Sequence, residues 1–177
     1  LHLARECSFR IPLTVISNDL ANYLEINDAS NSIAKPVDGG DYCQLLDDLM
    51  PVIQTRGGLA SSPAIIQNKL VQPEIRIYCV GSELMAFSME SPSLDYRVKQ
   101  DANIKLLDEV PKAIGEKLIC LMKNLDMDFG AADLKTDPTT GELCFLELNS
   151  SPMFTRFNYE SSDKLSELII RWLQNNE

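Results

Sequence analysis

The stretch from residue 129 to 154, FGAADLKTDPTTGELCFLELNSSPMF, constrains this chain more than any other, because it predicts two strands joined by a Pro-Thr-Thr-Gly turn. Side chains two residues apart on a strand lie on the same face. We therefore expect Glu147 and Asn149 on one face of the hairpin and Leu146 and Leu148 on the other, packed into a core. Two oxygen-bearing side chains then lie side by side, away from the core.

The first strand of this predicted hairpin contributes a third oxygen-bearing side chain, Asp133. If the chain turns at residues 139–141, Asp133 lies roughly opposite the end of the second strand that holds Glu147 and Asn149. Carboxylate and amide oxygens are hard ligands, and three of them on one face would suit Mg²⁺.

Composition and charge restrict the class of protein. The 177 residues are 45% hydrophobic and 24% charged, which is typical of a globular protein of one domain or two small subdomains. No apolar run approaches the ~20 residues of a membrane-spanning helix and no basic and apolar leader opens the chain, so we expect a cytoplasmic protein. A net charge of −10 disfavours nucleic acid as a partner, although a nucleotide requires only a local cluster of positive groups.

The side chains that most often act as nucleophiles or zinc ligands are scarce or scattered. The only histidine of the sequence is His2, which leaves catalytic triads and zinc sites without support. The cysteines are Cys7, Cys43, Cys79, Cys120 and Cys144; no two form a C-x-x-C pair and most have apolar neighbours, so we expect most of them to be reduced core thiols.

The order of predicted elements indicates an α+β protein with helices on antiparallel sheets. The strongest helix begins at Pro111 and keeps apolar residues at helical spacing as far as Leu125. Other helices are expected at 1–7, 19–26, 42–49 and 162–174, and a loop at 56–63. Strands are expected at 13–17, within 31–40, at 52–55, 64–70 and 73–81, and a second hairpin arm follows a tight Gly-Ser turn at 81–90. No capping residue precedes the first helix, so we expect further residues upstream.

Basic residues that could bind phosphate are separated along the chain, at Lys35 beside a Gly-Gly loop, Arg76, Arg97 and Lys99. With the carboxylates, they fit nucleotide triphosphate chemistry, in which Mg²⁺ and basic side chains neutralise the phosphates. Each residue alone has a simpler interpretation: Lys35 is typical of a solvated strand end, and Glu147 with Asn149 of a polar sheet face.

Four motifs, in this order and at these distances, resemble the ATP-grasp superfamily of carboxylate ligases: IAKPVDGG, IIQNKLVQPEIRIYCVGSELMAFSME, DYR, and FGAADLK followed by GELCFLELNSSPMF. The resemblance covers nearly the whole chain and is closest to the RimK-like branch, which includes protein glutamate ligases and the maturases of graspetide (microviridin-type) peptides. It implies an α+β fold in which two subdomains, 1–80 and 81–177, grip a nucleotide between antiparallel sheets.

The resemblance also implies roles for individual residues. Lys35 is similar to a lysine that contacts the phosphates, Glu74 to an acid that holds the ribose hydroxyls, and Arg97 to a catalytic arginine at the phosphate or acyl-phosphate end. The stretch whose main chain recognises adenine corresponds to Gln67, Asn68, Lys69 and Leu70. The magnesium ligands correspond to Asp133, Glu147 and Asn149.

Such ligases use ATP and Mg²⁺ to convert a carboxylate into an acyl phosphate, which an amine or hydroxyl then attacks to form an amide or ester. DYR and the apolar end of NSSPMF favour a ribosomally made peptide as the substrate. A protein glutamate ligase, a glutathione-type ligase and a nucleotide-binding module without turnover stay open, as does a homodimer. The family has a further N-terminal domain and an upstream lysine, so we expect activity to require those parts of the same protein.

Overall fold

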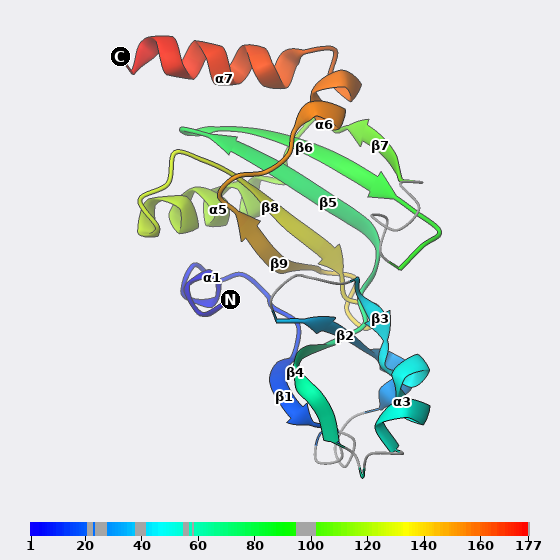
Figure 1. Ribbon diagram of the computed structural model, residues 1–177. Helices are drawn as coiled ribbons and strands as arrows, with labels where there is room; N and C mark the ends of the chain where they lie inside the picture. The colour runs from blue at the N-terminus through cyan, green and yellow to red at the C-terminus, as the bar shows by residue number, and fades with distance from the viewer. Residues whose placement is uncertain are drawn as a thin grey trace. The chain divides into compact units, whose positions relative to one another are not determined.

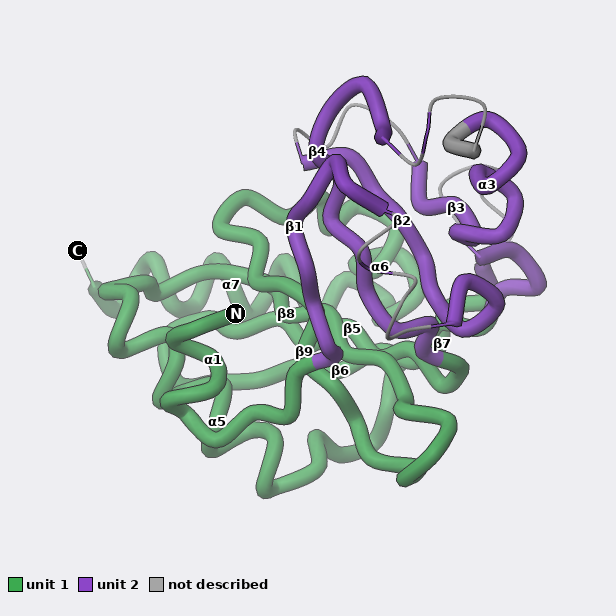
Figure 2. Tube along the Cα trace, turned by 90° about the horizontal axis from the view of Figure 1, so that it is seen from below, with its two compact units in different colours: residues 1–11, 71–90, 103–177 green, residues 12–70, 91–102 purple. Residues whose placement is uncertain are grey.

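The computed structural model of the chain describes residues 1–20, 23, 28–37, 42–54, 57, 59–94 and 102–176. These residues form two compact units (Figure 2). Each unit has its own antiparallel sheet. Unit 1, green in Figure 2, comprises residues 1–11, 71–90 and 103–177, and unit 2, purple, comprises residues 12–70 and 91–102. No helix in the described ranges is long and apolar enough to cross a membrane.

Unit 1 is built on a five-stranded sheet in the order β7-β6-β5-β8-β9 (Figure 1). Its strands are β5 (Val71–Val80), β6 (Glu83–Glu90), β7 (Asn103–Leu106), β8 (Phe129–Thr136) and β9 (Leu143–Asn149). Its helices are α1 (His2–Glu6), α5 (Lys112–Asn124), α6 (Thr155–Glu160) and α7 (Lys164–Asn175). Helices α1 and α5 cover one face, whereas α6 packs on the other, where the Phe157 ring lies 5.4 Å from Tyr78 and 5.2 Å from Phe87.

The core of unit 1 lies between α5 and the sheet. Helix α5 begins directly after Pro111, and Leu125 follows its last residue as the C-cap, so the helix expected from the apolar spacing is confirmed. Alternate residues of β5 and β8 pack in one cluster with Leu118, Leu121 and Met122, which are buried in α5 together with Gly115.

A bulge in the β8–β9 hairpin changes which side chain fills the core. The register shifts between Asp133 and Leu134, which leaves Leu146 as an extra residue in β9. Phe145 is 3% exposed and belongs to the core, and Leu148 packs against it. Leu146, expected in the core, is only half-buried, because the bulge displaces the alternation of strand faces by one residue.

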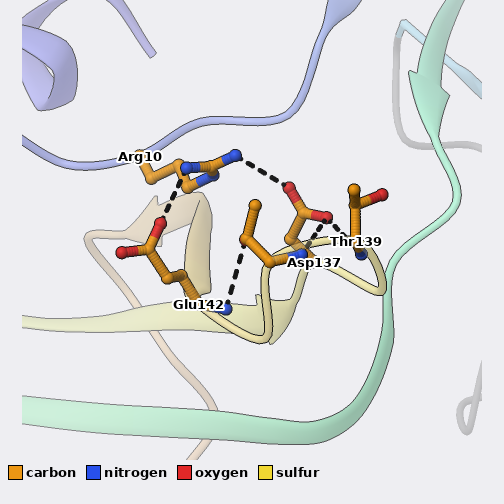
Figure 3. Close-up of polar contacts among 5 residues, drawn as sticks. Arg10, Asp137, Thr139 and Glu142 are labelled. Carbon is orange, nitrogen blue, oxygen red and sulfur yellow. Dashed lines mark hydrogen bonds and ion pairs between the residues drawn. The ribbon is translucent and has the colours of Figure 1, made fainter.

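The turn of this hairpin is held by Arg10 from the N-terminal segment (Figure 3). The guanidinium donates hydrogen bonds to Asp137 at 3.2 Å and to Glu142 at 2.7 Å. Asp137 also accepts the Thr139 N–H, and this main-chain hydrogen bond lowers the pKa of Asp137. The chain turns where the sequence predicts, with Gly141 at a φ of +73°.

Unit 2 has a four-stranded antiparallel sheet in the order β1-β4-β2-β3. Its elements are β1 (Thr14–Asp19), the short 3-10 helix η1 (Ala29–Asn31), β2 (Ser32–Pro36), β3 (Gln44–Leu45), α3 (Leu46–Gln54) and β4 (Leu59–Asn68). One face of the sheet packs around the fully buried Leu46 and Ile66. In this core the Tyr23 hydroxyl forms a hydrogen bond of 2.9 Å with that of Ser32.

Several features of the first half differ from the sequence predictions, among them residues 44–45, which lie in a predicted helix but form β3. Residues 52–54, predicted as a strand, belong to α3, which has Pro51 in its interior. Residues 59–63, predicted as a loop, form the first half of β4. Strand β5 belongs to unit 1, because both of its neighbours in the sheet, β6 and β8, lie there. The subdomain boundary predicted at residue 80 therefore falls inside unit 1.

Gly81 provides a stability test of the β5–β6 turn. Its φ is +60°, and an added Cβ would lie 2.5 Å from Nε1 of Trp172 in α7. Gly81→Ala should lower the free energy of unfolding by about 2–4 kcal/mol, because a steric clash adds to backbone strain.

Gly141→Ala is the matched control for this substitution. Its φ is also positive, but nothing lies within 4 Å of an added Cβ, so only the strain of about 1–2 kcal/mol applies. Urea denaturation measures both losses, and equal losses would show that Trp172 does not pack against Gly81.

Candidate functional site

Charged side chains form a row across three strands of unit 1, on the face opposite α5. The register pairs Arg76 of β5 with Asp133 of β8, and Asp133 with Glu147 of β9. Directly paired residues of antiparallel strands share a face, so the three side chains are neighbours.

Arg76 and Asp133 form a buried, bidentate ion pair. Nε and Nη2 of Arg76 each donate to one oxygen of Asp133 at 2.7 Å. The two side chains are only 12% and 8% exposed, and the guanidinium lies 5.1 Å from the ring centroid of Phe157. Two parallel charge-assisted hydrogen bonds and the aromatic ring hold the Asp133 carboxylate in one orientation.

A second ion pair lies beside the first, between Glu74 of β5 and Lys135 of β8. The register pairs the two residues, and their charged atoms are 3.1 Å apart. Burial raises the pKa of Glu74, while the ammonium of Lys135 partly opposes this rise. Both ion pairs bridge the same two strands, so they reinforce one register.

Glu147 is the unpaired acid of the row. Its side chain is exposed and makes no hydrogen bond or ion pair with any residue that the structure describes. Asn149 pairs in register with Ala131 and therefore lies on the same face, two residues from Glu147. The Asn149 Oδ1 accepts the Ser151 N–H at 2.9 Å and keeps a second lone pair.

The oxygens of Asp133, Glu147 and Asn149 fit a hard divalent cation such as Mg²⁺. Asp133 retains lone pairs beyond the two that Arg76 uses. Within the described part of the chain, no three histidine, cysteine or acidic side chains gather around one point. A metal ion here would therefore need further oxygens, such as those of a phosphate, and the ligand role of these residues stays a prediction.

Unit 2 contains the lysine predicted to contact phosphate. Lys35 of β2 pairs in register with Ile65 of β4, and Ile33 pairs with Gln67, so these side chains lie on the face opposite the unit 2 core. Among the described residues, none forms an ion pair or hydrogen bond with the Lys35 side chain. On this face, a lysine without a described partner lies beside the half-buried apolar side chains of Ile33 and Ile65.

Gln67, predicted to lie near adenine, has an unsatisfied acceptor. The side chain is 1% exposed and its Nε2 donates to the Thr14 hydroxyl at 2.9 Å. Its Oε1 is buried and has no hydrogen-bond partner among the described residues. A buried acceptor without a partner lowers the stability of the fold by roughly 1–3 kcal/mol. A hydrogen bond from a ligand donor to this oxygen would recover that free energy.

The residues that follow Gln67 are tied to unit 2 through their main chain. The Asn68 N–H donates to the Leu13 carbonyl at 3.3 Å, and the Lys69 N–H to the Asn31 carbonyl at 2.8 Å. The Leu70 side chain is 7% exposed. Recognition of a base by this stretch would have to use other main-chain groups.

Arg97, predicted as the catalytic arginine, lies outside the described residues, as does Lys99. Arg76 is the functional candidate that sequence reasoning missed, because it appeared only as one basic residue among several. Its pairing with Asp133 depends on a register between strands 57 residues apart. The sequence did contain a signal for this pairing. When the motifs EIR (74–76) and DLK (133–135) pair antiparallel, an acid lies opposite a base at each end of the motif.

Comparison with known proteins gives structural relatives only. No family model and no curated protein matches the sequence. PsnB, an ATP-grasp ligase solved with a precursor peptide and AMPPNP, matches with a TM-score of 0.76 and 21% identity over 98% of this chain and 57% of its own. Another PsnB structure contains Mg and ADP. The macrocyclase MdnC, bound with precursor peptide MdnA from Microcystis aeruginosa MRC, matches with a TM-score of 0.75 and 22% identity. The match covers 100% of this chain and 60% of MdnC.

A more distant relative has the same fold. D-alanine–D-alanine ligase from Bacillus anthracis matches with a TM-score of 0.66 and 14% identity over 98% of this chain and 65% of its own. The chain therefore has the ATP-grasp fold, as expected from its motifs, with two antiparallel sheets and packed helices. It spans 57% to 65% of the length of these three proteins.

The buried ion pair predicts a large cost for removing its cation. Arg76→Ala should lower the free energy of unfolding by about 3–5 kcal/mol, because Asp133 is then a buried charge without a partner. The control is Arg171→Ala, which removes an ion pair whose side chains, Arg171 and Glu83, are 60% and 58% exposed. This variant should lower the free energy of unfolding by less than about 1 kcal/mol. Urea denaturation compares the two variants, and similar losses would contradict the buried pairing.

The Glu74–Lys135 pair predicts a pH dependence. Burial raises the pKa of Glu74 in the folded state. The contribution of Glu74 to the free energy of unfolding is therefore complete below its ordinary pKa, and it is lost as pH rises through the raised pKa. Lys135→Met should raise the pKa of Glu74 further, because the opposing positive charge is removed. Carbon-detected NMR titration measures this, with the exposed Lys164→Met as control. A Glu74 pKa that does not move in Lys135→Met would show that the two charges do not interact.

Proposed function

We propose that this chain is the nucleotide-binding part of an ATP- and Mg²⁺-dependent ligase that joins a carboxylate to an amine or hydroxyl group, with a ribosomally made peptide as substrate. The observation that carries the proposal is the row of Arg76, Asp133 and Glu147 on an ATP-grasp fold. Glu147 is exposed and unpaired among the described residues, beside an aspartate that an arginine holds in place.

Asp133, Glu147 and Asn149 would hold the Mg²⁺. Bound there, the ion neutralises phosphate charge and so favours phosphoryl transfer. Arg76 keeps the Asp133 carboxylate oriented, which lowers the entropy lost when the metal binds.

The remaining nucleotide contacts come from residues with free polar groups. Lys35 has an ammonium free of described partners and would contact phosphate. Main-chain groups of residues 67–70 would recognise adenine, and the buried Oε1 of Gln67 would accept a hydrogen bond from the base only once its side chain turns outward. Glu74 would bind the ribose hydroxyls with the lone pairs that Lys135 leaves free.

The proposed reaction needs no nucleophile from the protein. A substrate carboxylate oxygen attacks the γ-phosphorus of ATP, the bond to the bridging oxygen breaks, and ADP and an acyl phosphate form. An amine or hydroxyl then attacks the acyl carbon, and phosphate leaves with the amide or ester bond complete. The protein contributes positioning and charge neutralisation, which agrees with a sequence whose single histidine is His2.

Two observations support a peptide as the substrate. PsnB and MdnC, which share the fold, were both solved with precursor peptides. In this chain Met153 is 87% exposed, while its carbonyl accepts a hydrogen bond of 2.8 Å from the Tyr78 hydroxyl. An apolar side chain on a fixed main chain is suited to contact part of a peptide.

Intact-mass measurement tests this proposal. The full-length protein, incubated with ATP, Mg²⁺ and acidic peptides encoded beside its gene, should release ADP and lower the peptide mass by about 18 Da per bond, because each condensation removes one water. A gain equal to one glutamate residue would instead assign a glutamate ligase. No mass change and no ADP release with any peptide would contradict the proposal.

Glu147→Gln tests the metal site within the same assay. It keeps the side-chain size but removes the charge, so ADP release should fall at least ~100-fold and Mn²⁺ affinity, measured by electron paramagnetic resonance, should weaken. The control is Glu116→Gln on α5, an exposed residue whose nearest cation, Lys112, is 3.9 Å away. Equal activity and metal affinity in the two variants would exclude Glu147 as a ligand.

A further inference from the structure

Two cysteines from distant parts of the sequence meet in unit 1. The Sγ atom of Cys7, at the end of α1, lies 2.8 Å from the Sγ atom of Cys120 in α5. Both are free thiols. A disulfide requires a sulfur separation of about 2.05 Å, so a small side-chain movement would join them.

The two thiols differ in exposure. Cys120 is exposed, whereas Cys7 is 5% exposed. Burial, followed by the hydrogen bond with Cys120, raises the pKa of Cys7 to about 11. The Asn124 amide donates to Cys7 at 3.3 Å and approaches Cys120 at 3.9 Å. A soluble oxidant therefore meets Cys120 first, with Cys7 directly behind it.

The other cysteines have different surroundings. Cys79 is buried and donates to the Gly81 carbonyl at 3.3 Å, and burial raises its pKa to about 11. Cys144 is also buried, and burial raises its pKa. Cys43 is half-buried in unit 2. Among the described residues, Cys7 and Cys120 alone place an exposed thiol against a buried one.

We propose that Cys7 and Cys120 form a redox modification site, which hydrogen peroxide oxidises to a disulfide. The Cys120 thiolate attacks one peroxide oxygen, the O–O bond breaks, and the departing hydroxide takes a proton to become water, leaving a sulfenic acid on Cys120. Cys7 then attacks that sulfur, the S–O bond breaks and a second water leaves with the Cys7 proton. The two thiols lose two electrons and the peroxide gains them, and a thiol reductant reverses the change by exchange.

The disulfide would fasten the N-terminal segment to the body of unit 1. This segment already packs through Phe9, whose ring lies 4.9 Å from that of Phe145, and it binds the β8–β9 turn through Arg10. After Ile11 the chain enters unit 2. A covalent link between α1 and α5 therefore suppresses local opening of the segment that leads into unit 2.

Peptide mapping without reduction tests this site in the wild-type protein. After peroxide treatment and blocking of free thiols, we expect one linked pair of peptides joining Cys7 to Cys120, ~2 Da lighter than the two thiol peptides and separated by dithiothreitol. Amide hydrogen exchange in α1 should slow at least ~10-fold on oxidation and recover on reduction. Cys120 found as sulfinic acid while Cys7 remains a free thiol would overturn the proposal.

Serine variants test the order of the two steps. In Cys7→Ser, dimedone should trap a sulfenic acid on Cys120, because the second thiol is gone. In Cys120→Ser, the buried Cys7 should stay reduced. Cys144→Ser is the control and should leave the linked pair intact. Fast oxidation of Cys7 in Cys120→Ser, or loss of the linked pair in Cys144→Ser, would overturn the proposal.

Discussion

The ion pair between Arg76 and Asp133 is the interaction on which the candidate site depends. Removing two charges from water is costly unless their geometry is good and their hydrogen bonds are complete. Here each oxygen of Asp133 accepts a hydrogen bond of 2.7 Å from one guanidinium, which lies against the ring of Phe157. The pair fixes β5 against β8 and holds the Asp133 carboxylate in place, while the separate pairing of β8 with β9 places Glu147 opposite Asp133. The proposed metal contacts of unit 1 depend on both registers.

The same sheet face combines a covered part and an open part. Helix α6 covers the aromatic part, where Phe157 packs on Tyr78 and Phe87, and the guanidinium of Arg76, next to the Phe157 ring, is largely shielded from solvent. Glu147 remains exposed and has no partner among the described residues. A rigid, buried ion pair next to an exposed carboxylate can hold a cation and the phosphate charges in fixed positions. Phosphoryl transfer relies on such positioning and charge neutralisation, and it needs no nucleophilic side chain.

Local patterns predicted some elements and long-range pairing decided the rest. The apolar spacing after Pro111 gives helix α5, and strand alternation places Glu147 and Asn149 on one face. The bulge at Leu146 has no local signal, since the register shift is visible only against β8. The pairing of Arg76 and the place of β5 in unit 1 also depend on partners far along the chain. The roles predicted for the magnesium ligands and the nucleotide contacts stay predictions.

Paramagnetic broadening by Mn²⁺ tests the central claim, that the open face of β8 and β9 binds a metal–nucleotide complex. Adding Mn²⁺ with AMPPNP to the isotope-labelled protein should broaden the amide signals of Asp133, Glu147 and Asn149, because broadening falls steeply with distance from the ion. Signals of α5, on the opposite face of the sheet, should broaden far less. Equal broadening of both faces, or broadening centred away from β8 and β9, would contradict the account.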